Sequence, residues 1–268
     1  MRKKLAMLLA LVLLITLAGA VPALAEEGSD ETLPLPPMIK DGASVVSVYA
    51  GAEAFPLEAS ENAPGEGDAP TIALDAILVY LSDNTFDQYA QTPGGFELFA
   101  SGTYALKDDI IEITLNKKYS MDDKKLEDFL ETEEFDLNEI RDHQIFGSQD
   151  GREVEAIFAD DCAVSYVNDE GVVSKLDVIW LYFSDGTFAE YAFLDGNVVP
   201  FGNGTYTLSE TGDFHILPAE EDYGTITMTW EDSLGNLAGK TETFNLGTMG
   251  AVCLYEKQDD ALLASLAF

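Results

Sequence analysis

The stretch "LYFSDGTFAEYA" at residues 181–192 nearly repeats "VYLSDNTFDQYA" at residues 79–90. Each copy places an Asp-Asn or Asp-Gly pair between two apolar, β-branched runs, which is a strong local signal for a β-hairpin. We therefore predict strand pairs at 74–82 with 85–91 and at 176–184 with 187–193, each joined by a two-residue type I′ turn. The duplicated Asp83 and Asp185 are expected to serve these turns rather than to bind a metal.

The likeness between the two copies extends well beyond the hairpin. Residues 74–106 align with 176–208 without a gap, and 16 of the 33 positions are identical. Shorter matches upstream and downstream occur at an offset of 109 residues. This is an internal duplication, with module 1 at 45–151, module 2 at 154–260 and a short apolar tail at 261–268. The Pro- and Gly-rich segment 60–70 then falls inside module 1, as a longer loop between its first two strands.

Each module is predicted to be all-β, because short apolar runs alternate with turn residues at about ten-residue spacing. We expect two tandem antiparallel barrels or meanders, with one short helix in module 1 at 120–131, where Leu126, Phe129 and Leu130 have helical spacing. The matching segment 229–240 contains two glycines and is expected to connect a hairpin. Further strands are predicted at 45–50, 97–106, 110–115, 133–137, 143–147, 154–159, 198–208, 213–217, 225–231, 241–246 and 251–256.

The central strand of each module is apolar on both faces. In 177–183, Ile179, Leu181 and Phe183 alternate with Val178, Trp180 and Tyr182. A strand with one solvated face would alternate apolar with polar residues. These strands are therefore expected to be covered on both sides, by a barrel interior and by the helix, a long loop or the other module.

The N-terminus has the pattern of an export signal. Arg2, Lys3 and Lys4 precede an apolar run that ends near Pro22, and Ala23-Leu24-Ala25 supplies a small-residue cleavage site. We expect residues 1–25 to be a Sec signal peptide without a lipobox, and the Pro-rich, acidic residues 26–44 to be a disordered tether. The protein is accordingly expected to be secreted and extracellular, with no membrane span.

The mature chain would be strongly acidic. After residue 25 it carries 11 basic against 49 acidic residues, a net charge of −38. Such a surface repels nucleic acid and anionic membranes. It is typical of a solvated acidic coat, and the expected partners are an unknown small molecule or an extracellular protein.

The apolar–"SDGTF"–aromatic hairpin, the following "GTY" and runs such as "IIEIT" resemble the small lipocalin-like (calycin-type) barrels of secreted bacterial proteins. The likeness covers the hairpin and the "GTY" strand of each module, less than half of the chain. It implies a stable scaffold or a cup that binds an apolar ligand.

Residues for catalysis or metal binding do not form a recognisable motif. His143 and His215 lie at unrelated positions and lack metal-ligand spacing. No G-x-S-x-G, phosphate-binding loop or calcium loop occurs, so neither a cofactor nor a metal site is predicted. Weak calcium binding at the pairs 122–123, 160–161 and 259–260 remains an alternative to solvated turns.

The leading hypothesis is a secreted, non-enzymatic binding or scaffold protein that holds a small apolar or aromatic ligand. A cell-surface or matrix protein of adhesin type is the alternative, and a secreted hydrolase is the third reading. Binding is expected on the loops, which vary between the two copies. Module 2 is the preferred site because it carries both tryptophans and both cysteines, which are predicted below to form a disulfide. The nominated ligand-binding residues, for which core packing is the competing role, are Trp180, Tyr182, Trp230, Tyr191 and Tyr206.

Both cysteines, Cys162 and Cys253, belong to module 2, and the offset of 109 matches them to Glu53 and Gln144 of module 1. Joint presence in one copy and joint absence in the other is what a bonded pair would produce. Since export permits oxidation, we predict a Cys162–Cys253 disulfide, with two free buried thiols as the alternative.

Overall fold

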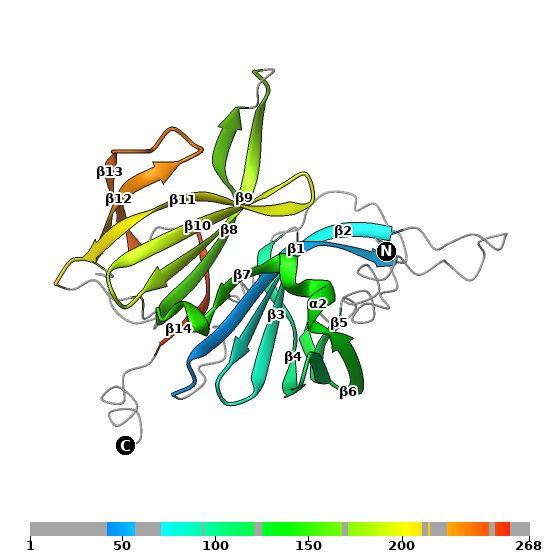
Figure 1. The fold of residues 1–268 in the computed structure, drawn as a ribbon. Helices are drawn as coiled ribbons and strands as arrows, with labels where there is room; N and C mark the ends of the chain where they lie inside the picture. Colours follow the sequence, from blue (N-terminus) through cyan, green and yellow to red (C-terminus); the bar gives the residue numbers. More distant parts are fainter. Residues whose placement is uncertain are drawn as a thin grey trace, which may run out of the picture.

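A computed structural model describes residues 42–56, 71–92, 94–120, 125–167, 171–210, 214, 224–246 and 250–257 (Figure 1). The predicted signal peptide, most of the tether, the loop 60–70, nearly all of the strand 213–217 and the apolar tail lie outside these residues. The described residues form strands, one short α-helix, α2 (Leu137–Ile140), and two single-turn 3-10 helices, η1 (Arg141–His143) and η2 (Ser148–Asp150). The strands are β1 (Val45–Pro56), β2 (Thr71–Leu81), β3 (Thr85–Thr92), β4 (Gly95–Lys107), β5 (Ile110–Ser120), β6 (Lys125–Asp136), β7 (Gln144–Gly147), β8 (Val154–Val167), β9 (Val173–Phe183), β10 (Thr187–Leu194), β11 (Asn197–Leu208), β12 (Thr225–Ser233), β13 (Thr241–Asn245) and β14 (Val252–Glu256).

The two modules have the same sheet topology. The strand orders are β6-β5-β4-β3-β2-β1-β7 and β13-β12-β11-β10-β9-β8-β14. In each sheet six strands follow one another as an antiparallel meander, and the last strand returns to pair with the first. The prediction of a mostly β, antiparallel, duplicated fold is confirmed at this level.

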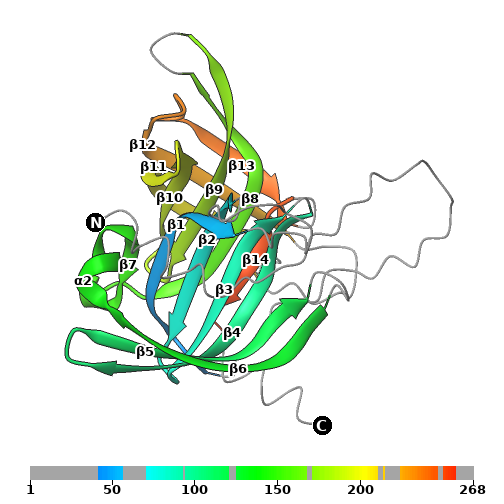
Figure 2. The same ribbon diagram turned by 90° about the vertical axis from the view of Figure 1, so that its right-hand side faces the viewer.

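Closed barrels are not formed by the described strands. The outermost strands of each sheet, β6 with β7 and β13 with β14, do not pair with each other. The first sheet instead curls into a half-barrel, with β5 and β6 wrapping toward its concave side (Figure 2).

The two repeated hairpins form as predicted, but their turns differ from the predicted type. A type I′ turn needs positive φ at two residues, whereas only Asn84 (φ 65°) and Gly186 (φ 81°) have it. Each connection is a three-residue loop. The Asn84 N–H donates to the Leu81 carbonyl, and the Gly186 N–H donates to the Phe183 carbonyl. Asp83 Oδ1 accepts bonds from the Thr85 backbone N–H (2.9 Å) and hydroxyl (2.6 Å), and Asp185 does the same for Thr187.

The predicted helix at 120–131 is wrong. Residues 125–131 belong to β6, which pairs with β5 along its length and contains a bulge opposite Leu115–Lys117. Phe129 and Phe135 of this strand pack on the hydrophobic cluster at the concave face of module 1. The segment therefore buries its aromatic side chains as a strand and not as a helix. The α-helix lies later in the chain at α2, where the Asp136 side chain caps it by accepting from the Asn138 N–H. In module 2, residues 234–240 connect the hairpin of β12 and β13, within the segment predicted to do so.

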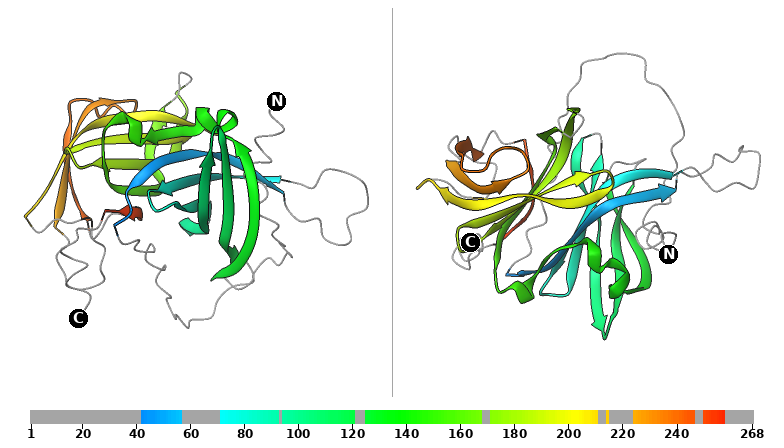
Figure 3. Two further views of the ribbon diagram at one scale, coloured as in Figure 1. Left: turned by 60° about the horizontal axis from the view of Figure 1, so that its bottom comes forward. Right: turned by 45° about the horizontal axis from the view of Figure 1, so that its top comes forward.

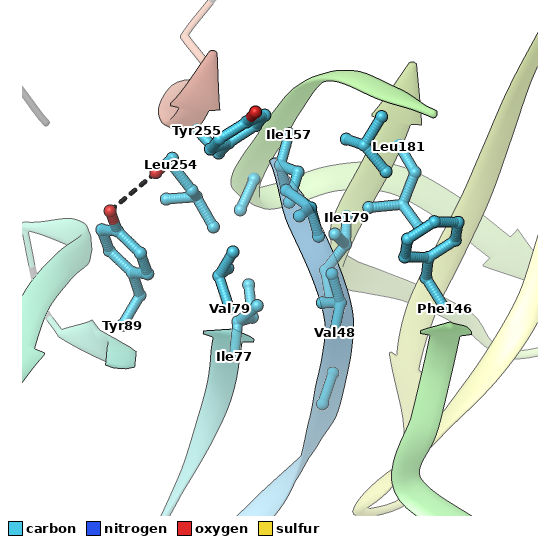
Figure 4. Close-up of a cluster of buried hydrophobic side chains, with 14 of the residues drawn as sticks. Val48, Ile77, Val79, Tyr89, Phe146, Ile157, Ile179, Leu181, Leu254 and Tyr255 are labelled. Atoms are coloured by element: carbon cyan, nitrogen blue, oxygen red, sulfur yellow. Dashed lines mark hydrogen bonds between the residues drawn. The ribbon is translucent and has the colours of Figure 1, made fainter. Parts of the chain in front are cut away.

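The back faces of the two sheets share one hydrophobic core. Ile77, Val79 and Leu81 of β2 meet Ile179, Leu181 and Phe183 of β9, and the side chains on this face are almost completely buried. Figure 4 shows Ile77, Val79, Ile179 and Leu181 together with four further core residues, Val48, Phe146, Ile157 and Tyr255. The second apolar face expected for each central strand is therefore covered by the other module, and the modules pack as one body.

The packing between modules is reciprocal. The Tyr89 hydroxyl of module 1 donates to the Leu254 carbonyl of module 2 at 2.7 Å (Figure 4). Tyr191, the copy of Tyr89, donates in turn to the carbonyl of Ile145, which is the copy of Leu254 (2.9 Å). Such an exchange of equivalent contacts defines an isologous, pseudo-two-fold interface.

Strand pairing also corrects the register of the repeat. Gly102 pairs with Leu115, and its copy Gly204 pairs with Trp230. Trp230 therefore corresponds to Leu115, and not to Met121 as the offset of 109 implied. The offset changes because the β11–β12 connection is longer than the β4–β5 turn. It returns to 109 because the next hairpin is shorter in module 2, where Thr229 pairs with Thr241, than in module 1, where Thr114 pairs with Thr132.

Candidate functional site

Four of the five nominated ligand-binding residues lie together on the concave side of module 2. Trp180, Tyr182, Trp230 and Tyr206 belong to the hydrophobic cluster on this face, whereas Tyr191 lies on the opposite face, between the modules. Tyr182 is 0 % and Trp230 3 % exposed. These two side chains are core residues in this structure, so ligand contact at them would require the face to open.

An aromatic triad lines each concave face. In module 2 it consists of Phe158, Tyr182 and Tyr206, with Tyr182 edge-on to both neighbours at centroid distances of 6.0 and 5.1 Å. The hydroxyl of Tyr206 donates to the Phe183 carbonyl (2.9 Å). Burial raises the pKa of Tyr206 to about 12, so it remains a neutral donor at physiological pH.

Module 1 repeats the triad as Tyr49, Tyr80 and Tyr104. Tyr80 again lies edge-on to both neighbours, at 5.7 and 4.9 Å. The hydroxyl of Tyr104 donates to the Leu81 carbonyl (2.8 Å), in the place of the bond that Tyr206 makes. The triad is thus part of the duplicated framework.

Phe214 closes the concave face of module 2. It comes from the long β11–β12 connection, is 3 % exposed, and its ring lies 5.6, 4.9 and 5.7 Å from the rings of Phe158, Tyr182 and Tyr206. In module 1 the equivalent connection is the two-residue turn Asp108–Asp109 between β4 and β5. That turn is too short to supply a similar plug.

A buried carboxylate lies beside the triad of module 2. Glu190 is 1 % exposed, and its Oε2 accepts a hydrogen bond from the Trp230 indole N–H at 3.0 Å. It accepts a second bond from Trp180. Burial raises the pKa of Glu190, and the two indole donors partly oppose this rise. Because buried charges require partners, these two tryptophans hold the carboxylate in place.

Glu190 and three residues around it all differ from their counterparts in module 1. Gly202 lies opposite Glu190, where an added Cβ would come 2.7 Å from Oε2. The copies of Trp180, Glu190, Gly202 and Trp230 in module 1 are Leu78, Gln88, Ala100 and Leu115. Both indole donors, the carboxylate and the glycine that makes room for it are therefore specific to module 2. This polar group was missed from the sequence, although the four substitutions were its signal.

Gln88 retains a buried polar group in module 1. Its side chain is 1 % exposed, and its Nε2 has no hydrogen-bond partner among the residues that the structure describes. An unsatisfied buried donor costs about 1–3 kcal/mol. The concave face of module 1 therefore presents an amide donor that an acceptor oxygen would stabilise.

The predicted disulfide is not formed. Cys162 is exposed and Cys253 is buried, and both are free thiols. Cys253 pairs with Phe158 on β8, and Cys162 lies four residues farther along that strand, within a bulge. The bulge and the left-handed backbone of Cys162 (φ 54°) leave this side chain exposed, while Cys253 is buried, so the two thiols do not meet.

Among the described residues, no three His, Cys, Asp or Glu side chains are arranged to hold a metal ion. The pairs 122–123 and 259–260 lie outside those residues. Within the same described part, no helix has the length and apolar character needed to cross a membrane.

Comparison of the chain with protein-family models, curated proteins and solved structures finds no match in any of the three.

Proposed function

We propose that this is a secreted, non-enzymatic binding protein of two lipocalin-like modules, and that module 1 holds a small apolar or aromatic ligand on its concave face. The supporting observation is Phe214. Module 2 fills the space over its aromatic triad with this side chain, whereas module 1 keeps the triad and lacks the connection that delivers the plug. A ligand would take in module 1 the place that Phe214 takes in module 2. Because Tyr80 is 2 % and Gln88 1 % exposed, it would enter from the partly exposed Tyr49, and the face would open to admit it.

The chemistry of the face agrees with such a ligand. Tyr49, Ile113 and Phe129 are partly exposed apolar side chains that pack on the buried cluster of module 1. The unpaired Gln88 amide adds one donor, which suits a molecule with an acceptor oxygen on an apolar body. A few polar groups within an apolar lining are typical of small-molecule sites.

The test is titration of the protein with the neutral fluorescent probe N-phenyl-1-naphthylamine. Wild-type protein should bind one probe molecule, and Tyr49→Ala should weaken binding at least tenfold. Phe214→Ala, which unplugs module 2, should add a second site. Absence of probe binding by a folded wild type, or undiminished affinity in folded Tyr49→Ala, would contradict the proposal.

A further inference from the structure

Each module carries a two-stranded arm that extends beyond its sheet (Figures 1 and 3). Arm 1 comprises residues 51–56 and 71–75, and arm 2 comprises residues 160–167 and 173–177. In both arms the two strands pair with each other, while the neighbouring strands of the sheet stop at the base. The base of each arm lies against the other module: a Cβ added at Gly196 would lie 3.8 Å from Ala52 Cβ of arm 1, and one added at Gly95 would lie 4.0 Å from Asp161 Oδ1 of arm 2.

Asp75 and Asp177 are the same position in the two copies, and they occupy these two bases. Both lie on the faces that pack against the other module, two residues before Ile77 and Ile179 of the shared core. Their carboxyl groups are hydrogen-bonded to each other. A residue that meets its own copy lies on the pseudo-two-fold axis, so the duplication itself places two acids together.

The surroundings add further negative charge to this pair. Asp177 Oδ1 accepts the backbone N–H of Cys162 (2.8 Å), and Asp160 and Asp161 directly precede Cys162 on β8. Burial, together with the charges of Asp161 and Asp177, raises the pKa of Asp160. A Cβ added at Gly95 on β4 would lie 4.0 Å from Asp161 Oδ1, so the neighbour on that side is an uncharged glycine.

A hydrogen bond between two carboxyl groups requires a proton on one of them. Burial, the negative charge of Asp177 and this hydrogen bond raise the pKa of Asp75 to about 7. With both groups ionised, the bond is replaced by repulsion between like charges.

We propose that Asp75 and Asp177 form a pH-responsive latch between the two modules: one shared proton holds the arm bases together, and its loss loosens them. Because Asp75 binds its proton more tightly in the folded than in the unfolded chain, the latch stabilises the fold at low pH. Its contribution decreases as the pH rises toward 7 and is absent well above 7. The latch is independent of the ligand site proposed in module 1.

Urea unfolding of the full chain between pH 6 and pH 8 tests the latch, since ordinary carboxyl groups do not titrate there. The unfolding equilibrium constant of the wild type should increase by up to about tenfold over this range. Asp75→Asn and Asp177→Asn should each remove most of this change and be more stable than the wild type at pH 8. Asp185→Asn, at an exposed turn, and His143→Gln are the matched controls and should keep it.

Hydrogen exchange of the arm amides, corrected for intrinsic rates, supplies a second readout. Protection of residues 51–56 and 160–167 should decrease from pH 6 to pH 8 in the wild type and stay constant in Asp75→Asn. An unchanged pH dependence of stability in both Asn variants, or arm protection that does not respond to pH in the wild type, would overturn the latch.

Discussion

The Trp230 indole donates its N–H to the Glu190 carboxylate at 3.0 Å, in a part of module 2 where both side chains are buried. The bond ties the centre of β12 to β10 across the intervening strand β11. The equivalent residues of module 1, Leu115 and Gln88, cannot form it. This polar contact therefore distinguishes the cores of two otherwise similar modules.

Trp230→Phe keeps an aromatic ring against Phe188 and removes the indole donor. We expect a loss of about 1–3 kcal/mol at pH 7, because Glu190 would lose one of its two donors while remaining buried. The loss should be smaller near pH 4, where a protonated Glu190 needs less stabilisation. Urea unfolding at the two pH values measures this. An equal loss at both pH values would show that ring packing, rather than the hydrogen bond, accounts for the effect.

Gly202→Ala places a methyl group 2.7 Å from Glu190 Oε2 and 3.2 Å from the Asp232 carbonyl oxygen. Because Glu190 is held by two tryptophans, it cannot move away freely, and we expect destabilisation of about 1–3 kcal/mol. Thermal or urea unfolding gives the value. In the double variant Gly202→Ala/Glu190→Ala, the steric part of the cost should disappear.

Tyr89→Phe and Tyr191→Phe each remove one of the two reciprocal hydrogen bonds between the modules. Each should cost about 1–3 kcal/mol, because a carbonyl in the interface loses its donor. Tyr104→Phe, which removes a bond within module 1, is the control for loss of a tyrosine hydroxyl. If the modules unfold as one body, both interface variants should shift a single transition. Two separate transitions would contradict the shared core.

The two cysteines should differ in reactivity. Cys162 is exposed, whereas burial raises the pKa of Cys253 to about 12, and thiols react as thiolates. Iodoacetamide should label one thiol per chain in the native protein and two after unfolding without reductant. No labelling of the unfolded, unreduced chain would instead demonstrate a disulfide.

Much of the fold could be predicted because the duplication repeated each local signal. The Asp-Asn and Asp-Gly pairs located the hairpins, and the double alternation in 177–183 identified both buried faces. The segment 125–131 was misassigned because Leu126, Phe129 and Leu130 fit a helical stripe, whereas pairing with β5 leaves Leu130 82 % exposed. Long-range pairing of this kind is not encoded in local spacing.

The candidate site was less predictable for related reasons. Tryptophans and tyrosines were nominated by residue type, but the same residues build the core. The local sequence around Phe214 does not indicate that its ring packs on Phe158, Tyr182 and Tyr206. Joint presence of Cys162 and Cys253 suggested a bond, but the structure exposes one thiol and buries the other. The pairing of Asp75 with Asp177 depends on a two-fold relation between modules, which neither copy carries alone.

The shared core also sets the order in which the chain can fold. The Tyr255 hydroxyl bonds the Ala43 carbonyl, 212 positions earlier in the sequence. Chains are synthesised from the N-terminus, so module 1 emerges with an apolar back face that is covered only after module 2 has been made. Most of that cover comes from β8, β9 and β10, and β14 completes it with Leu254 and Tyr255. Contacts of such high sequence separation slow folding, and removal of β14 should expose apolar surface of module 1 as well as of module 2.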